Sequence, residues 1–302
     1  MFQLLKYVHA LYFAIIGTLQ NIIYTIRLYY NSLYENNVKK ISFTEFYKNN
    51  AEKILLRKIK EGDDKAITYL ATYYKIEKDH INMKKYYLMA IEKGDAKAMI
   101  YLAAYYYENE KDHINMKKYY LMAIEKGDTK TMIYLADYYY DIEKDHINMK
   151  KYCLMAIEKG DTKAMIYLAD YYCDIEKDYI NMKKYYLMAI TKGNTDAMNN
   201  LGNYYGENEK DYVNMKKYCL MAVDKDNNKA MTNLGNYYNN LKDYVNMKKY
   251  YLMAINKGNI KAMFNLANYY QVIEKDYQES KKYYTMALDN NQQVKSLHPP
   301  LF

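Results

Sequence analysis

Residues 128–160 read DTKTMIYLADYYYDIEKDHINMKKYCLMAIEKG, and this stretch decides the fold. Its first half places apolar residues at i, i+3, i+4 and i+7, the spacing of one face of an α-helix: Met132, Leu135, Ala136 and Tyr139. Its second half repeats that spacing after Asp145, and neither half alternates as a strand does. The pattern predicts one helix over residues 129–140 and a second over residues 147–159.

The same stretch recurs along the chain. The triplet Leu-Met-Ala begins at Leu88, Leu121, Leu154, Leu187, Leu220 and Leu252, and Thr285-Met286-Ala287 is a seventh copy. The interval between copies is constant, except that the copy at Leu252 follows one residue sooner than the others. The seven repeats, numbered 1 to 7, span residues 63–94, 95–127, 128–160, 161–193, 194–226, 227–258 and 259–291.

Turn residues mark the ends of the predicted helices. Gly127 follows a second helix, where a left-handed residue is needed, and Asp128 then caps the next first helix. Asp145 precedes the second helix, and Ala156 holds a position that is alanine in all seven repeats. A small residue there lets neighbouring helices approach closely. Since one helix pair can bury only one side by itself, the repeats must stack. We therefore expect an all-α fold, a right-handed α-solenoid of seven two-helix repeats.

The repeat resembles the Sel-one-like repeat, a branch of the tetratricopeptide-like helical arrays. Repeat 5 carries the matching residues: Ala197, Leu201, Gly202 and Tyr205 on the first helix, then Asp211, Tyr218, Cys219, Ala222 and Val223 on the second. In other repeats Leu-Gly becomes Leu-Ala, and the loop between the helices is short and charged, as at 108–111. The resemblance covers residues 63–291. It implies a protein-binding scaffold or adaptor and identifies no partner.

The two ends of the chain depart from the repeat. Residues 1–34 are predicted to form an apolar helix, because 7–26 contains no Asp, Glu, Lys or Arg and is long enough to span a bilayer. This helix is expected either to anchor the chain in a membrane or to cap the solenoid. The expected localisation is accordingly cytoplasmic or membrane-tethered. Residues 35–62 are predicted to be a degenerate half-repeat, and residues 292–302 an irregular tail.

Composition argues against several classes of protein. Among 302 residues, 44 Lys and Arg against 36 Asp and Glu leave a net charge of +8, which is too small to indicate a nucleic-acid binder. Three cysteines exclude a disulfide scaffold, and Cys153 and Cys219 occupy equivalent positions too far apart to pair. The chain has no glycine-rich phosphate loop and no nucleophile beside a base. We expect neither an enzyme nor a cofactor.

Three histidines could suggest a metal site. However, His80, His113 and His146 are one position seen in three repeats, and the other four repeats have Tyr there. Stacked helices lie about 8–10 Å apart, whereas ligands of one zinc ion lie about 2 Å from it. We expect an aromatic packing position and no metal.

A pair of lysines recurs on every second helix, from Lys84-Lys85 to Lys281-Lys282. These rows could bind nucleic acid or another anionic surface, although only weakly, because each repeat also carries Asp and Glu. A solvated outer face is the preferred interpretation.

Asparagines on the first helices of repeats 5 to 7 are the candidate peptide-binding residues. They form pairs three positions apart: Asn200 with Asn203, Asn233 with Asn236, and Asn265 with Asn268. Repeats 2 to 4 have Tyr at the first of these positions and Ala104, Asp137 and Asp170 at the second. Amides both donate and accept, so a ladder of them can hold an extended peptide backbone, and Lys229 and Lys261 could attract an acidic segment. An Asn-rich composition explains the same residues without any function.

These observations favour a non-enzymatic scaffold that binds protein partners along the concave face of the solenoid. The alternatives are a membrane-anchored adaptor, held by residues 7–26, and a weak binder of nucleic acid or anionic surfaces.

Overall fold

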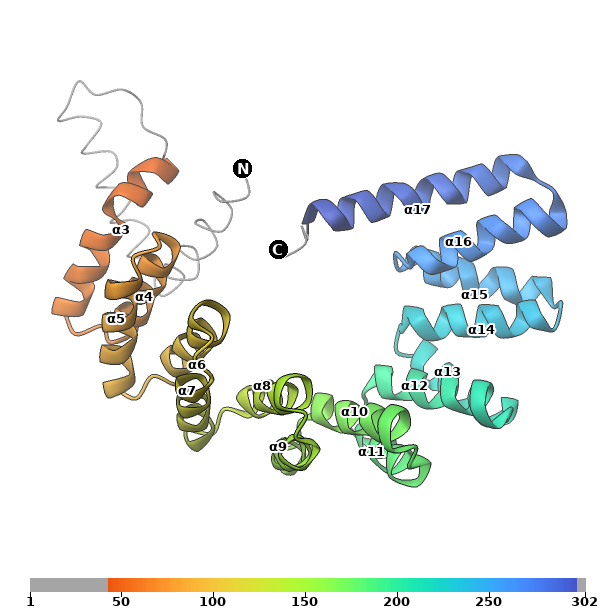
Figure 1. The fold of residues 1–302 in the computed structure, drawn as a ribbon. Coiled ribbons are helices and arrows are strands. Elements are labelled where there is room, and N and C mark those ends of the chain that lie inside the picture. Colours follow the sequence, from red (N-terminus) through yellow and green to blue (C-terminus); the bar gives the residue numbers. More distant parts are fainter. Residues whose placement is uncertain (1–42, 298–302) are drawn as a thin grey trace, which may run out of the picture. The chain divides into compact units, whose positions relative to one another are not determined.

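The computed structural model describes residues 43–297, and every regular element in that range is helical. After α3 (Phe43–Lys60), the helices follow in pairs, one pair per repeat (Figure 1). The pairs are α4 (Lys65–Ile76) with α5 (His80–Glu92), α6 (Ala96–Tyr105) with α7 (His113–Glu125), α8 (Thr129–Tyr138) with α9 (His146–Glu158), α10 (Thr162–Tyr171) with α11 (Tyr179–Thr191), α12 (Thr195–Tyr204) with α13 (Tyr212–Val223), α14 (Asn228–Asn240) with α15 (Tyr244–Asn256), and α16 (Ile260–Tyr269) with α17 (Tyr277–Leu297). The all-α, two-helix repeat is confirmed.

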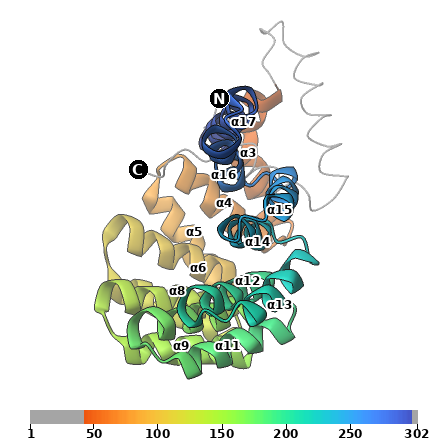
Figure 2. The same cartoon turned by 90° about the vertical axis from the view of Figure 1, so that its right-hand side faces the viewer.

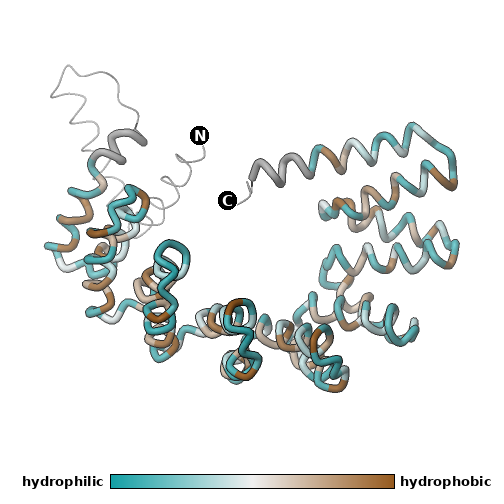
Figure 3. The backbone as a smooth tube through the Cα atoms, viewed as in Figure 1, coloured by the Kyte–Doolittle hydropathy of each residue, from teal (hydrophilic) through white to brown (hydrophobic). Residues whose placement is uncertain are grey.

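The chain divides into two compact units, unit 1 up to Tyr152 and unit 2 from Cys153. In repeats 1, 2 and 4 to 7 the two helices of a repeat pack against each other, and within each unit a second helix packs against the first helix that follows it. The first helices α12, α14 and α16 of unit 2 also contact one another in that order (Figure 2). Hydrophobic and hydrophilic residues both occur along the helices in the coloured part of the chain, as expected where one stripe of a helix is buried (Figure 3).

Small and aromatic residues build the core. The alanine shared by all repeats is completely buried each time, at Ala90, Ala123, Ala156, Ala189, Ala222, Ala254 and Ala287. Beside it, a tyrosine near the end of the first helix stacks on a tyrosine of the second helix in the same repeat. In repeat 5, Tyr205 and Tyr218 have ring centroids 5.7 Å apart and planes 3° apart. The phenol rings thus provide buried area between the two helices.

The predicted caps are present. The Asp112 carboxylate accepts hydrogen bonds from the backbone and side-chain N–H groups of Asn115, which hold the pKa of Asp112 below its ordinary value. The carboxylate of Asp145 has the same two contacts with Asn148. Gly127 has φ = 89°, the left-handed conformation predicted for the residue after a second helix.

The link between the two helices of a repeat is a π-helical turn in each of the longer repeats, 2 to 5 and 7. These turns are η1 (Tyr106–Glu110), η2 (Tyr139–Glu143), η3 (Tyr172–Glu176), η4 (Tyr205–Glu209) and η5 (Tyr270–Glu274). Repeats 1 and 6 are one residue shorter and have no such turn: Asp243 N–H donates to the carbonyl of Tyr238, five residues back, whereas Asp211 N–H reaches Tyr205, six residues back. The extra residue is therefore absorbed by widening the last turn of the first helix, so the first helix of repeat 3 ends two residues earlier than predicted.

The second lysine of each pair is exposed, as predicted of a solvated face, whereas the first lysine is partly buried in repeats 1 to 6, which corrects that prediction for one of the two rows. The first lysine of the pair reaches the glutamate that ends the π turn of the next repeat. Lys117 Nζ lies 2.6 Å from Glu143 Oε1, and their side chains are 30% and 32% exposed. Tyr138 OH donates to the same oxygen over 2.8 Å. Lys84 with Glu110, Lys183 with Glu209 and Lys248 with Glu274 form the same contact, which we call the clasp.

Both ends of the described range are helical. Helix α3 packs against α4, as expected of a half-repeat, and Tyr74 OH donates to Glu52 Oε1 over 2.6 Å. Helix α17 runs to Leu297, so the prediction of an irregular tail was wrong for 292–297, where neither Gly nor Pro interrupts the helix before Pro299.

No helix within residues 43–297 is both long and apolar enough to cross a bilayer. The apolar helix of residues 1–34 lies outside the described residues, so membrane anchoring by residues 7–26 remains a prediction.

Candidate binding clefts

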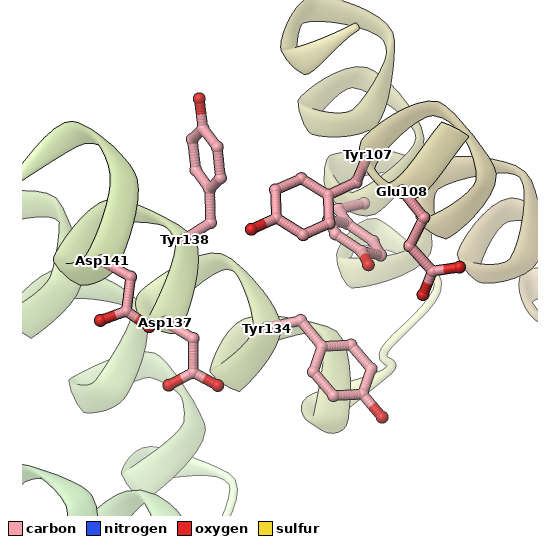
Figure 4. Close-up of a pocket in the computed structure, with 7 residues that line it drawn as sticks. Tyr107, Glu108, Tyr134, Asp137, Tyr138 and Asp141 are labelled. Carbon is pink, nitrogen blue, oxygen red and sulfur yellow. The ribbon is translucent and has the colours of Figure 1, made fainter. Parts of the chain in front are cut away.

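A cleft of about 290 Å³ lies in unit 1 between repeat 2 and repeat 3 (Figure 4). We call it the first cleft. One wall comes from η1 and α7, and the other from α8 and η2. Its lining residues are Tyr107, Glu108, Tyr120, Tyr134, Asp137, Tyr138 and Asp141.

Carboxylates and phenol rings together line the first cleft, and no lysine or arginine lines it. Figure 4 shows Asp137 and Asp141 on one wall, with Tyr107 and Glu108 on the wall opposite. Tyr134 is 46% exposed, so its ring is available to a ligand. Burial raises the pKa of Tyr120 to about 12, which keeps its phenol neutral at physiological pH. The cleft can therefore offer negative charge and aromatic faces to a cation.

A second cleft, of about 280 Å³, lies in unit 2 between repeat 4 and repeat 5. It is lined by Cys173, Asp174, Lys177, Tyr179, Tyr186, Asn200, Asn203, Tyr204, Glu207 and Asn208. Most of its residues occupy the positions of the first cleft two repeats further along the chain. Asn200 replaces Tyr134, Asn203 replaces Asp137, and Glu207 replaces Asp141. The repeat thus builds the same cleft in each unit with different side chains.

A buried hydrogen bond supports the second cleft. Tyr186 OH donates to Asp170 Oδ1, and burial raises the pKa of the Asp170 carboxyl above its ordinary value. The equivalent bond in repeat 6 uses a neutral acceptor, since Tyr251 OH donates to Asn236 Oδ1 over 2.7 Å. The position therefore accepts either a carboxylate or an amide.

A third cleft, of about 610 Å³, lies between α4 and α6 in unit 1. Its polar lining is mixed in charge. Thr68 Oγ1 donates to Asp95 Oδ2 over 2.6 Å, and Lys93 Nζ lies 3.8 Å from Asp64 Oδ1. Because its charges are largely opposed by one another, this cleft offers less net charge to a ligand than the first cleft does.

The structure separates the candidate asparagines into two groups. Asn200 and Asn203 line the second cleft. Asn200 also accepts a hydrogen bond from Asn199 Nδ2, over 3.3 Å. In repeats 6 and 7 the amides bind protein groups as well. Asn233 Nδ2 donates to Asn199 Oδ1 over 2.9 Å, and Asn265 Nδ2 donates to Asn236 Oδ1 over 2.8 Å. These amides therefore have less capacity for a peptide backbone than the predicted ladder requires.

The remaining candidates lie at the surface. Asn268 and Lys261 are exposed. Lys229 is also exposed, and its Nζ lies 3.2 Å from Asp196 Oδ1, which opposes its charge. The clefts do not bring these three residues together.

Sequence reasoning missed most of the acidic residues that line the clefts. Glu108, Asp141, Asp174 and Glu207 occupy one position of repeats 2 to 5, near the end of the first helix. An acidic residue at the same place in four successive repeats is a visible signal.

The histidines pack against aromatic rings, as predicted. His113 and Tyr138 have ring centroids 5.2 Å apart, and His113 Nδ1 lies 2.7 Å from Tyr138 OH. No group of three or more possible metal ligands occurs among residues 43–297. Cys153 and Cys219 are buried and form no disulfide with each other. Burial raises the pKa of Cys219 to about 12, so this thiol is not a nucleophile at neutral pH.

Comparison with known proteins identifies the fold. No protein-family model and no curated protein matches the sequence. Among solved structures, a protective antigen of uropathogenic Escherichia coli strains, displaying an SLR fold, is similar with a TM-score of 0.54 and 20% identity over 82% of this chain. This chain covers 58% of that antigen's length. A Sel1 repeat protein from Oxalobacter formigenes is similar with a TM-score of 0.52 and 20% identity, over 79% of this chain and 99% of the other.

Proposed function

Because the described residues have the fold of Sel1 repeat proteins, we propose that this chain is a non-catalytic scaffold that binds an extended protein segment in its clefts. The observation that carries the proposal is the recurrence of one cleft at equivalent positions in both units. The buried alanine of the second helix is the same in each repeat, whereas several of the side chains that line the clefts differ, such as Tyr134 and Asn200. This division is what a repeat scaffold needs for recognition without loss of stability.

The chemistry of the clefts favours a segment that carries Lys or Arg. The first cleft presents Glu108, Asp137 and Asp141 beside the exposed ring of Tyr134. A guanidinium or ammonium group can bind the carboxylates by charge-assisted hydrogen bonds and lie on the tyrosine ring. This differs from the acidic segment expected from Lys229 and Lys261, since Asp196 lies beside Lys229. Asn200 and Asn203 remain candidates to bind the peptide backbone in the second cleft.

A binding assay with defined probes tests the proposal. Fluorescent decapeptides of alternating Arg and Ser, Glu and Ser, or Gln and Ser are titrated with the full-length chain. We expect the basic peptide to bind at least about tenfold more tightly than the acidic one. The triple variant Glu108→Gln, Asp137→Asn, Asp141→Asn should weaken binding of the basic peptide by about tenfold or more.

The matched control removes three carboxylates from outside the clefts, with Glu92→Gln, Glu125→Gln and Glu158→Gln on the second helices, where all three are exposed. This control should leave the affinity nearly unchanged. Tighter binding of the acidic peptide, or equal losses in the two triple variants, would contradict the proposal.

A further inference from the structure

A second surface, at the start of the second helices, carries exposed aliphatic side chains. The second residue of each second helix is Ile or Val in repeats 1 to 6. Their exposed fractions are Ile81 83%, Ile114 80%, Ile147 81%, Ile180 84%, Val213 80% and Val245 81%. These side chains contribute almost nothing to the core, and β-branched residues are not favoured in helices. The fold therefore gives no reason for an aliphatic residue there in six repeats.

A lysine lies three residues before this Ile or Val, at the end of the link between the two helices. Its backbone is left-handed in every repeat. The φ angles are 61° at Lys78, 54° at Lys111, 53° at Lys144, 54° at Lys177, 55° at Lys210, 56° at Lys242 and 58° at Lys275. Gly or Asn adopts this conformation more easily than Lys does, and the chain uses Gly at its other recurrent left-handed position. Lysine is thus retained at a conformational cost, which indicates that its charge or its reach is used.

The charge of these lysines is available to a partner. All seven are exposed, and the ion pairs of the described residues do not include them. The neighbouring cap aspartate, for example Asp112, directs its carboxylate to the N–H groups at the start of its own helix. The glutamate that precedes the left-handed lysine, for example Glu143 before Lys144, is held by another lysine in the clasp.

A second exposed lysine follows one turn after the aliphatic residue. Lys118 lies four positions beyond Ile114 and so on the same face of α7. The equivalents are Lys85, Lys151, Lys184, Lys217 and Lys249, all exposed. We define the basic edge separately in each unit, as its three Ile or Val residues, the lysines four positions beyond them and the left-handed lysines three positions before them. The left-handed lysines are Lys78, Lys111 and Lys144 in unit 1 and Lys177, Lys210 and Lys242 in unit 2, and Lys177 also lines the second cleft.

We propose that the basic edge binds the surface of an anionic lipid bilayer. Each repeat offers an aliphatic side chain that can enter the boundary of the acyl chains and two lysines that can bind lipid phosphate or carboxylate groups. Exposed tyrosines, Tyr179 at 38% and Tyr212 at 46%, precede two of the aliphatic residues and suit the bilayer interface. A nucleic acid would use the lysines but would leave the aliphatic side chains in water, and so lipid fits the whole edge better.

Sedimentation with vesicles tests this proposal on the full-length chain. Vesicles of phosphatidylcholine alone measure any binding by other parts of the chain, and vesicles that also contain phosphatidylserine measure the contribution of charge. We expect the protein to bind the anionic vesicles at least about tenfold more strongly at low ionic strength, and salt to reduce the difference.

Two sets of variants locate the surface. Changing Lys78, Lys111, Lys144, Lys177, Lys210 and Lys242 to Asn suits the left-handed backbone, so this variant should fold at least as well as the parent chain. The control changes six exposed lysines of the first helices to Gln, at Lys65, Lys97, Lys130, Lys163, Lys229 and Lys261, and so removes the same charge. The Asn variant should lose about tenfold or more of the extra binding to anionic vesicles, and the Gln variant should lose less than about threefold.

A third variant separates lipid from other anions. Changing the six Ile or Val residues of the basic edge to Asn leaves every charge in place and should also weaken binding to anionic vesicles. Equal losses in the Asn and Gln lysine variants would overturn the proposal, because the effect would then come from net charge alone. Binding to single-stranded DNA or polyglutamate with no preference for anionic vesicles would overturn it in favour of those partners.

Discussion

The contacts between helices and the clefts of this protein differ in how much their residues vary from repeat to repeat. At the contact between helices, the same residues return in every repeat: the buried alanine at Ala90 and its six equivalents, the stacked tyrosine pair and the capping aspartate. In the clefts, equivalent positions change from Tyr134 to Asn200 and from Asp137 to Asn203. The constant positions carry stability and the variable ones are free to carry recognition. Each prediction below tests this separation.

The largest effect is expected at the constant alanine. Replacing the completely buried Ala189 by Leu inserts three carbon atoms where α11 packs against its neighbours. We expect a loss of about 3 kcal/mol in the free energy of unfolding, measured by urea titration followed by circular dichroism. Leu187→Ala, at a side chain that is 41% exposed, is the control and should cost less than about 1 kcal/mol. Similar losses at the two positions would show that the alanine position is not a tight contact.

A smaller effect, on binding and not on stability, is expected in the first cleft. The double variant Tyr134→Asn, Asp137→Asn gives this cleft the amides of the second cleft. It removes one aromatic face and one carboxylate, so affinity for the basic decapeptide should fall by about tenfold, with unchanged helicity. The reciprocal variant Asn200→Tyr, Asn203→Asp should raise it. A large loss of helicity in either variant would mean that the variable positions also carry the fold.

The clasp should contribute less to the free energy of unfolding than the buried alanine does, because its side chains are about one-third exposed. Lys183→Gln removes the contact with Glu209 and should cost about 0.5–1 kcal/mol of unfolding free energy, less at high salt. Lys216 offers a natural control: it lies over the ring of Tyr237, and Leu241 takes the place of the glutamate in the shorter repeat 6. Lys216→Gln should therefore cost less than Lys183→Gln. A larger loss of unfolding free energy in Lys216→Gln than in Lys183→Gln would show that the contact with Glu209 does not stabilise the fold.

The smallest expected effect is a change in melting temperature on replacing Asp170, whose pKa is raised by burial. A carboxyl group with a higher pKa in the folded state stabilises the fold below its unfolded pKa, and that contribution is lost as pH rises through the folded pKa. Asp170→Asn should therefore raise the melting temperature slightly at pH 7, and the difference should disappear near pH 3. Asn236, which already accepts a hydrogen bond from Tyr251, shows that an amide fits. A variant less stable at pH 7 would mean that the charged form is required.

The sequence predicted the repeats well because each depends on local signals. The spacing of apolar residues predicted the helix pairs, and Asp145 and Gly127 predicted where helices begin and end. The π turns did not follow from hydrophobic spacing, since one added residue leaves that pattern intact, although the one-residue difference in length between repeats contained the information. The clasp joins residues 26 positions apart, such as Lys117 and Glu143, and becomes evident only when consecutive repeats are stacked.

The clefts were harder to predict than the fold, because they depend on which side chains face one another across two repeats. The asparagines were visible as a pattern, yet Asn233 and Asn265 bind other asparagines of the chain. The carboxylates of Glu108 and Asp141 belong to different repeats, and stacking of these repeats places them on opposite walls of the first cleft. A regular pattern along the sequence therefore predicts position on a helix more reliably than availability to a ligand.

Hydrogen–deuterium exchange on the full-length chain, with and without the basic decapeptide, tests the central claim most directly. We predict slower exchange in the segments around the first cleft, α8 with η1 and η2, and around the second cleft, α12 with η3 and η4. The second helices α5, α13 and α15, which line neither the first nor the second cleft, should exchange at the same rate with and without the peptide. Protection confined to the second helices, with none around either cleft, would contradict the assignment of recognition to the variable positions.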